Sequence, residues 1–362
     1  MRLRFLVVSM IVLALSAGTG YAQTFTGTID GYWSYNGNTP VQGGQRVNVG
    51  RAFDLYDQAF SLNYGELAVD YKPNNVGLRV DVGFGDAAEV VHYNEVNIWR
   101  HIQQAYITGT SGKFTLDFGK FVTPFGAEVI ETKDNLNYTR GFVFTLGIPF
   151  YHMGGRATYA ASDKVSIAGY VVNGWDNVKE NNSAKSIGVN FTVKPHEKIA
   201  LIGNFLYGKE NPNTDEARRL YEGIVTVTPF DRWTLTGDFV YGEDHFVPSA
   251  PGFPAPKGLW KGFAGYSKFK VMEKLNLNGR YEYFTDRDGL RTGTPQQLQS
   301  GTVTAQVPVS DVTIWSEFRK DWSNNDIFLR TRAGVLGPED SFSDHQNTFT
   351  FGVTYAFTKM VK

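Results

Sequence analysis

From about Phe25 to Phe357 the chain repeats one unit, a stretch of about ten alternating apolar and polar residues followed by a polar break. Successive side chains of a β-strand point to opposite faces, so alternation places one face against an apolar medium and the other against water. A barrel in a membrane has this requirement on every strand. The pattern therefore predicts an all-β chain that folds as a transmembrane antiparallel up-and-down β-barrel.

The alternation predicts about 16 strands, most of them 10 to 14 residues long. That length is close to the roughly 9 to 11 residues that a tilted strand needs to cross the hydrocarbon layer. The predicted strands are 25–35, 58–71, 76–86, 99–110, 113–121, 149–161, 165–174, 184–195, 198–209, 219–230, 232–243, 258–271, 274–286, 296–308, 311–321 and 346–357.

Short and long connections take turns between these strands. Seven short turns lie around residues 73, 111, 162, 196, 231, 272 and 310. Eight longer loops span 36–57, 87–98, 122–148, 175–183, 210–218, 244–257, 287–295 and 322–345. This order requires an even strand count, with both termini on the short-turn side. In bacterial barrels the short turns are periplasmic and the long loops extracellular.

The first residues predict export. Arg2 and Arg4 precede an uncharged run from Phe5 to Ala17, and small residues follow at Gly20 and Ala22. This is typical of a secretory signal peptide, residues 1–22, cut after Ala22. The run is shorter than the roughly 20 residues that a spanning helix needs. We therefore expect residues 23–362 to form a single-domain barrel in the bacterial outer membrane.

Composition excludes several classes of function. The chain has no Cys, which excludes disulfides and thiol chemistry. Its net charge is −1, or −3 once Arg2 and Arg4 are removed, so neither a polyanion nor a nucleic-acid partner is implied. The expected partners are outer-membrane lipid and lipopolysaccharide, small hydrophilic solutes or ions, and a homo-oligomer is an open alternative. No cofactor is expected.

The phase of the alternation predicts which side chains face the interior. An Arg that faced lipid at the bilayer midplane would cost about 2 to 4 kcal/mol, so the charged face of each strand must be the inner one. Strands 99–110 and 258–271 do not alternate cleanly, and their phase stays open. The predicted pore-lining residues are Glu66, Arg79, Asp81, Asp117, Arg156, Asp238, Arg280, Glu282, Trp315, Glu317 and Arg319.

A barrel of about sixteen strands leaves a water channel unless something narrows it. The longest loop, and the candidate for narrowing the channel, is the third long loop, 122–148. Folded into the lumen, its charges would set ion preference at the narrowest point; a solvated surface loop is the alternative. The charged residues of this candidate constriction are Glu128, Glu131, Lys133, Asp134 and Arg140.

Four segments carry a resemblance to a known family. They are GKFVTPFGAEVIE (119–131), NLNYTRG (135–141), PFYHMGGRATY (149–159) and GRYEYFTDRDGLRTG (279–293). In order and spacing they resemble the outer-membrane β-barrel porins called OmpL-like. The resemblance implies a Gram-negative porin. The sequence departs from the usual pattern at its end, where TKMVK follows Phe357.

The leading hypothesis is therefore a passive diffusion porin for ions and small hydrophilic solutes. One alternative is a structural or interaction barrel whose loops 36–57 and 322–345 bind a partner. A hydrolase would need a catalytic pair built on His245 or His345, which adjoin Asp244 and Asp344. The six His residues show no metal-binding spacing, so neither a metal site nor an enzyme is expected.

Overall fold

The computed structural model describes residues 23–211, 215–247, 255–331 and 341–361. The predicted signal peptide, 1–22, lies outside the described residues, so its assignment stays a prediction. Within the described parts no helix is long and apolar enough to cross a membrane.

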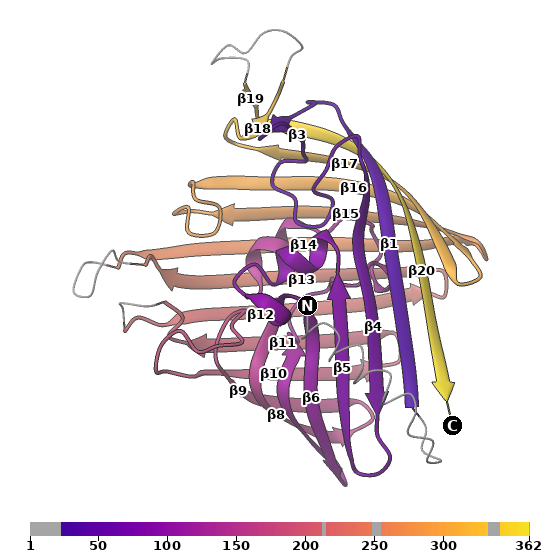
Figure 1. Ribbon diagram of the computed structural model, residues 1–362, viewed down its shortest axis with the longest axis vertical. Coiled ribbons are helices and arrows are strands. Elements are labelled where there is room, and N and C mark those ends of the chain that lie inside the picture. Colours follow the sequence, from indigo (N-terminus) through magenta and orange to yellow (C-terminus); the bar gives the residue numbers. More distant parts are fainter. Residues whose placement is uncertain (1–22, 212–214, 248–254, 332–340, 362) are drawn as a thin grey trace.

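The described residues form a closed antiparallel barrel of sixteen strands (Figure 1). Each strand pairs with its neighbours in the chain, and β1 pairs with β20 from Gln23 opposite Val361 to Asn36 opposite Thr348, which closes the barrel. The strands are β1 (Gln23–Asn36), β4 (Phe60–Tyr71), β5 (Val76–Phe84), β6 (Ile102–Ser111), β7 (Phe114–Val122), β8 (Tyr151–Ser162), β9 (Val165–Val172), β10 (Ser186–His196), β11 (Ile199–Gly208), β12 (Arg218–Phe230), β13 (Trp233–His245), β14 (Lys257–Met272), β15 (Leu275–Asp286), β16 (Gln296–Val309), β17 (Val312–Ser323) and β20 (His345–Val361).

Short elements lie in the long loops. Two hairpins form there, β2 with β3 and β18 with β19. Their bounds, with those of the helical turns, are β2 (Val41–Gln42), β3 (Gln45–Arg46), β18 (Phe328–Leu329), β19 (Phe342–Ser343), α2 (Asp86–Val91), η1 (Asn97–Arg100), η2 (Thr132–Asp134) and η3 (Val143–Gly147).

The predicted fold is confirmed strand by strand: each of the sixteen expected strands overlaps one strand of the barrel, and seven short turns alternate with eight long loops. Most boundaries differ by at most two residues, and two differ by more. The predicted strand 99–110 begins at Ile102, because 97–100 form the helical turn η1. The last strand continues past Phe357 to Val361, because its partner β1 extends to Gln23 and offers backbone hydrogen-bonding groups that far.

The structure shows which side chains face inward on β6 and β14, the two strands whose phase the sequence left open. On β6, Gln104 faces inward, where its side-chain amide donates to Asp81 at 2.5 Å. On β14, the inner face carries Trp260, Ala264 and Tyr266, all buried. This inner face is apolar because the third long loop covers it, which removes the polar alternation that a water-filled interior would impose.

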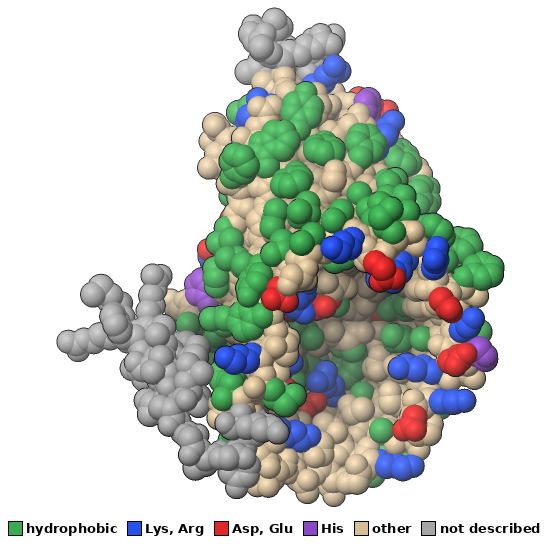
Figure 2. Space-filling model, turned by 90° about the vertical axis from the view of Figure 1, so that its right-hand side faces the viewer, with side chains coloured by type: hydrophobic (Ala, Val, Ile, Leu, Met, Phe, Trp, Pro, Cys, Tyr) green, Lys and Arg blue, Asp and Glu red, His purple; other side chains and the backbone are tan. Residues whose placement is uncertain are grey.

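Figure 2 shows the molecule from the end at which the short turns lie. A hollow opens there, with Lys, Arg, Asp and Glu side chains gathered around it and apolar side chains on the outer wall. The buried apolar cluster lies within the barrel, and it combines inward wall residues with residues of the long loops, among them Phe53, Val91 and Phe144. The barrel is thus partly filled by its own loops.

Candidate pore constriction

The third long loop, residues 123–150, lies inside the barrel and is called loop 3 here. It joins β7 to β8, yet its helical turn η3 packs against β13, β14 and β15 and its turn η2 packs against β20. In the strand order of the closed barrel, β13 to β15 lie across from β7 and β8, whereas β20 lies between β1 and β17. Loop 3 therefore crosses the lumen to the far wall.

Carboxylates of the far wall hold the beginning of loop 3. The backbone N–H of Gly126 donates to Glu222 at 2.9 Å, and that of Ala127 donates to Asp238 at 3.1 Å. Gly126 has a φ of 102°, a left-handed conformation that favours glycine. A β-carbon there would also lie only 2.8 Å from the Glu128 carbonyl oxygen. The chain can therefore turn toward these carboxylates because residue 126 is glycine.

Glu317 and Glu282 hold the later part of the loop in the same way. The Glu317 carboxylate accepts the backbone N–H of Tyr138 at 2.7 Å and that of Thr139 at 3.1 Å. Glu282 accepts the backbone N–H of Val143 at 3.1 Å. Hydrogen bonds to a charged acceptor contribute about 1.5 to 3 kcal/mol each, so these contacts fix the path of the loop.

A carboxylate of the first strand also reaches loop 3. Asp30 accepts hydrogen bonds at 2.8 Å from Thr132 Oγ1, from Tyr138 Oη and from Asn63 Nδ2. Tyr138 in turn packs edge-on against Trp315, with ring centroids 6.2 Å apart. Loop 3 is therefore bound on the β1 side of the barrel as well as on the far wall.

Arginines of the wall complete the attachment. Arg280 Nη1 lies 2.6 Å from the Glu128 carboxylate and donates at 2.5 Å to the Thr139 carbonyl oxygen. Arg319 donates at 2.6 Å to the carbonyl oxygen of Arg140. Arg140 itself donates to the carbonyl oxygen of Tyr138 at 2.5 Å, within the loop. Burial lowers the pKa of the Arg140 guanidinium, and loop carbonyl oxygens accept its hydrogen bonds.

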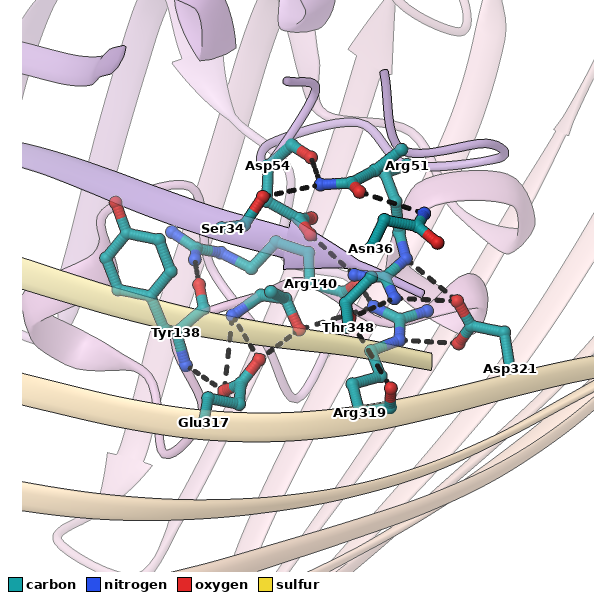
Figure 3. Close-up of polar contacts among 12 residues, drawn as sticks. Ser34, Asn36, Arg51, Asp54, Tyr138, Arg140, Glu317, Arg319, Asp321 and Thr348 are labelled. Atoms are coloured by element: carbon teal, nitrogen blue, oxygen red, sulfur yellow. Dashed lines mark hydrogen bonds and ion pairs between the residues drawn. The ribbon is translucent and has the colours of Figure 1, made fainter. Parts of the chain in front are cut away.

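Figure 3 shows how the first long loop, residues 37–59, joins this network. Arg51 pairs with Asp54 at 2.5 Å and with Asp321 at 2.7 Å, and Asp321 also pairs with Arg319 at 2.6 Å. All four side chains are at most 1% exposed. Buried charges of this kind are stable only when paired and hydrogen-bonded, so the network ties two loops to one wall.

Apolar contacts close the space behind the network. Phe144 of η3 packs against Phe53 and Phe150, with ring centroids 5.9 Å and 5.4 Å away. Trp260 of β14 donates from its indole N–H to the carbonyl oxygen of Gly147 at 3.0 Å. These contacts fill the β13–β15 side of the lumen with packed apolar side chains.

The charges of loop 3 that meet water lie at its turn η2. The side chains of Lys133 and Asp134 pair with each other and are 25% and 55% exposed. Glu131 is partly exposed. Burial raises the pKa of the Glu131 carboxyl, and the negative charges of Asp134 and Asp81 raise it further. Asp81 belongs to β5, so Glu131 lies close enough to the near wall, formed by β5 to β8, for the two charges to interact, while the turn itself packs against β20.

That near wall carries arginines that remain partly exposed. Arg79 on β5 pairs with Asp81 at 3.0 Å, and its side chain is 33% exposed. Arg156 on β8 pairs with Asp117 at 2.8 Å, and its side chain is 22% exposed. Each arginine thus has a carboxylate partner while part of the guanidinium stays open to the interior.

The residues predicted to line or narrow the pore fall into two groups, one buried and one partly exposed. Of the loop residues, Glu128 and Arg140 are buried in the attachment to the wall, whereas Glu131, Lys133 and Asp134 keep exposed surface. The predicted wall residues that lie buried are Glu66, Asp81, Asp117, Asp238, Arg280, Glu282, Trp315, Glu317 and Arg319. Those that keep exposed surface are Arg79 and Arg156. Their assignment as constriction and pore-lining residues stays a prediction.

Sequence reasoning missed several residues that position loop 3. Asp30 and Glu222 occupy inward phases of strands that the alternation predicted, so the same phase rule identifies them as interior carboxylates. Arg51 and Asp54 lie in an irregular loop, where no periodicity indicates direction. Their role depends on the ion pair of Arg51 with Asp321, far away in the sequence.

The histidines of the hydrolase alternative lie at loop bases. His345 Nδ1 is 2.6 Å from Asp344 and 3.4 Å from Ser343 Oγ. In a catalytic triad the nucleophile and the acid use opposite ring nitrogens, whereas here both contact the same one. Among the described residues, the His245 side chain has a long contact of 3.8 Å, from Nε2 to Glu216. Across the described residues, no group of three or more His, Cys, Asp or Glu could hold a metal ion.

Together, the closed sixteen-strand barrel and its inward loop define an outer-membrane barrel of the porin class. A sequence model of the family described as "Putative beta-barrel porin-2, OmpL-like" matches residues 23–357. The chain belongs to this family, and the resemblance found in the sequence is confirmed. No curated protein matches the chain.

Solved structures share the fold. OmpT of Vibrio cholerae is 12% identical, with 94% of this chain and 99% of that chain covered and a TM-score of 0.60. The outer membrane channel DcaP of Acinetobacter baumannii is 11% identical, with 94% and 99% covered and a TM-score of 0.61. An anion-selective porin from Comamonas acidovorans is 10% identical, with 93% and 100% covered and a TM-score of 0.59. At these identities the likeness concerns the fold alone.

Proposed function

We propose that this protein is a passive diffusion channel for ions and small hydrophilic solutes, and that loop 3 narrows it. A sixteen-strand barrel is wide enough for water to remain where side chains and loops do not fill it. Family membership and porin structural neighbours support a channel in the outer membrane. We further propose that the protein acts without catalysis or cofactor.

The observation that carries this proposal is the set of wall carboxylates that hold loop 3. Its buried contacts go to Asp30, Glu222, Asp238, Glu282 and Glu317, on β1 and on the far wall. Partly exposed charges lie at turn η2, which also binds Asp30 through Thr132, and on β5 and β8. We infer that the aqueous path runs between turn η2 and this near wall.

Charges on the two sides of such a path set its ion preference. Glu131, Lys133 and Asp134 would stand on the loop side, opposite Arg79 and Arg156 on the wall. Opposed charges across a narrow aqueous gap create a local field that acts on permeating ions and dipolar solutes. Because the arginines are paired with carboxylates, the field depends on local geometry more than on the net charge of the chain.

The interaction-barrel alternative receives less support. Its first proposed binding segment, 36–57, is largely committed to the barrel itself, since Arg51, Phe53, Asp54 and Asp57 are buried. The second, 322–345, lies partly outside the described residues. Homo-oligomerisation fits the channel proposal, and one solved structure of the Vibrio cholerae protein is described as a trimer form.

The direct test is a planar lipid bilayer. Purified protein should add stepwise ohmic conductance, and a salt gradient across the membrane should give a reversal potential that reports the ratio of cation to anion permeability. A folded barrel that inserts without conducting ions would overturn the proposal. Binding of a stoichiometric partner to such a silent barrel would favour the interaction alternative.

A further inference from the structure

A groove of about 430 Å³ lies on the outer face of the barrel, outside the lumen. Its polar lining comes from Lys261, Thr285, Arg287, Gln296, Gln297 and Asn324. They lie at the long-loop ends of β14 to β17, and Figure 1 shows β14, β15 and β16 side by side.

The strand register places this groove on the outside. Lys261 is paired with Thr285, and Thr285 with Gln297, so the three form one row across β14, β15 and β16. Two residues further along each strand, the same face carries Phe263 and Tyr283. Side chains two apart on a strand share a face, and this face is the apolar one that meets lipid.

The groove sits at the depth of lipid headgroups. The aromatic row beneath it, with Phe263, Tyr283 and Trp322, lies two residues, or about 7 Å along the strand, nearer the bilayer centre. Trp322 also packs against Tyr281, with ring centroids 6.4 Å apart. Tyr and Trp gather at membrane interfaces, so the polar row above them reaches the headgroups of the leaflet on the long-loop side.

The groove has an excess of positive charge. Lys261 and Arg287 are exposed, and among the described residues neither side chain has an ion pair. The Lys261 ammonium lies over the Tyr241 ring, 5.7 Å from its centroid. The neighbouring carboxylate, Glu243, is already neutralised by Arg219 and by Lys257, the latter at 2.6 Å.

A second acid near the groove, Asp288, is hydrogen-bonded to the backbone. Asp288 accepts the backbone N–H of Leu259 at 3.0 Å, which fixes the base of the loop that carries Arg287. Among the described residues, two cations therefore line the groove at headgroup depth without an ion pair to a carboxylate. Such a pair attracts a phosphate, since each Lys or Arg near a membrane surface adds favourable energy with an anionic headgroup.

We propose that this groove binds a phosphate of an outer-leaflet glycolipid, the lipid A portion of lipopolysaccharide. Lys261 and Arg287 contact the phosphate, Thr285 and Gln297 offer polar groups to the sugar, and the acyl chains descend over Phe263 and Tyr283. Acyl chains distinguish this ligand from free phosphate, because the apolar row lies directly below the cations. The proposal does not depend on conductance, so it and the channel proposal can fail separately.

Native mass spectrometry of the full barrel in detergent, titrated with bisphosphorylated lipid A, tests the site. The double variant Lys261→Gln with Arg287→Gln should bind this probe roughly 10- to 30-fold more weakly, as expected for the loss of two headgroup cations. The matched control is Lys359→Gln, an exposed lysine at the opposite, short-turn end of β20. It should bind the probe as the wild type does.

Titrations with two other ligands distinguish lipid A binding from the binding of apolar lipid or free phosphate. Fully dephosphorylated lipid A should bind wild-type protein as weakly as the double variant binds the bisphosphorylated probe, and millimolar inorganic phosphate should displace little of that probe. Equal binding by the double variant and the wild type would overturn the proposal. So would equal affinity for phosphorylated and dephosphorylated lipid, or full displacement by inorganic phosphate.

Discussion

Arg280 on β15 and Glu128 in loop 3 form an ion pair of 2.6 Å, and their side chains are 0% and 3% exposed. The pair joins the barrel wall to the loop that crosses its lumen. Glu128 also accepts the backbone N–H of Gly141 at 2.7 Å, so one carboxylate fixes two points of the attachment. Burial raises the pKa of the Glu128 carboxyl although Arg280 opposes this, so the loss of Arg280 would leave a carboxyl that is costly to ionise.

Arg280→Met should detach this part of loop 3 and destabilise the barrel. Removal of one partner of a buried ion pair costs about 3 to 5 kcal/mol, because the other charge is left without a counter-ion. Urea unfolding of the refolded barrel measures this loss. The control Lys133→Met removes a partly exposed pair with Asp134 and should cost less than about 1 kcal/mol. Equal losses in the two variants would contradict the account.

Gly352→Ala should disturb loop 3 from the opposite side. Gly352 faces inward on β20, and a β-carbon there would lie 2.4 Å from the Tyr138 ring. Overpacking of this kind costs about 1 to 3 kcal/mol. Gly169→Ala is the matched control, since a β-carbon at that strand glycine meets no atom within 4 Å. A stability loss in the control as large as that in Gly352→Ala would show that any strand glycine is sensitive.

Acid should destabilise the second long loop through His92. Burial and the positive charge of Lys120 lower the pKa of His92 to about 3, from an ordinary value of 6.5. The neutral imidazole therefore contributes stability that is complete above pH 6.5 and is lost as the pH falls toward 3. At pH 5 the loss relative to pH 7.5 reaches about 2 kcal/mol.

The measurement for His92 is a difference between two proteins. Unfolding free energies at pH 7.5 and pH 5 are compared in the wild type and in His92→Gln, which removes the titrating group. Other titrating groups contribute to both proteins and cancel. An acid sensitivity that is the same in the variant and in the wild type would mean that His92 is not its source.

Ion preference should follow the partly exposed charges and not the buried ones. Glu131→Gln with Asp134→Asn removes negative charge from turn η2, and we expect the cation-to-anion permeability ratio to fall by about two-fold or more. Arg79→Gln should raise it. The control Glu273→Gln lies in a short turn, where its side chain is 87% exposed, and should leave the reversal potential unchanged. No change in the double variant would place turn η2 away from the ion path.

The barrel could be predicted from the sequence because its determinants are local. The lipid-facing side of each strand is apolar for the same physical reason everywhere, so Leu78 and Val80 on β5 show it as plainly as Phe349 and Phe351 on β20. Strand count, connection lengths and most inward residues follow from that one rule. Strands depart from the rule where a loop, instead of water, covers their inner face.

The position of loop 3 could not be predicted in this way. Its contacts join residues far apart in the sequence, such as Tyr138 with Glu317 and Gly126 with Glu222, and nothing in the loop itself indicates these partners. The phase of β14 could not be predicted for the same reason. Its inner face is apolar because residues such as Trp260 contact loop 3, at Gly147, instead of water. Composition therefore left open whether loop 3 was internal.

The most direct test of the central claim, that loop 3 narrows an aqueous path, is single-channel conductance with and without the loop. Val122 pairs with Tyr151, so a short hairpin turn can join β7 to β8 in place of residues 124–149. Circular dichroism and urea unfolding first verify that the shortened barrel is folded. The account predicts stepwise conductance for the wild type and a several-fold larger step for the shortened barrel. A folded wild type without conductance, or equal steps from the two proteins, would contradict it.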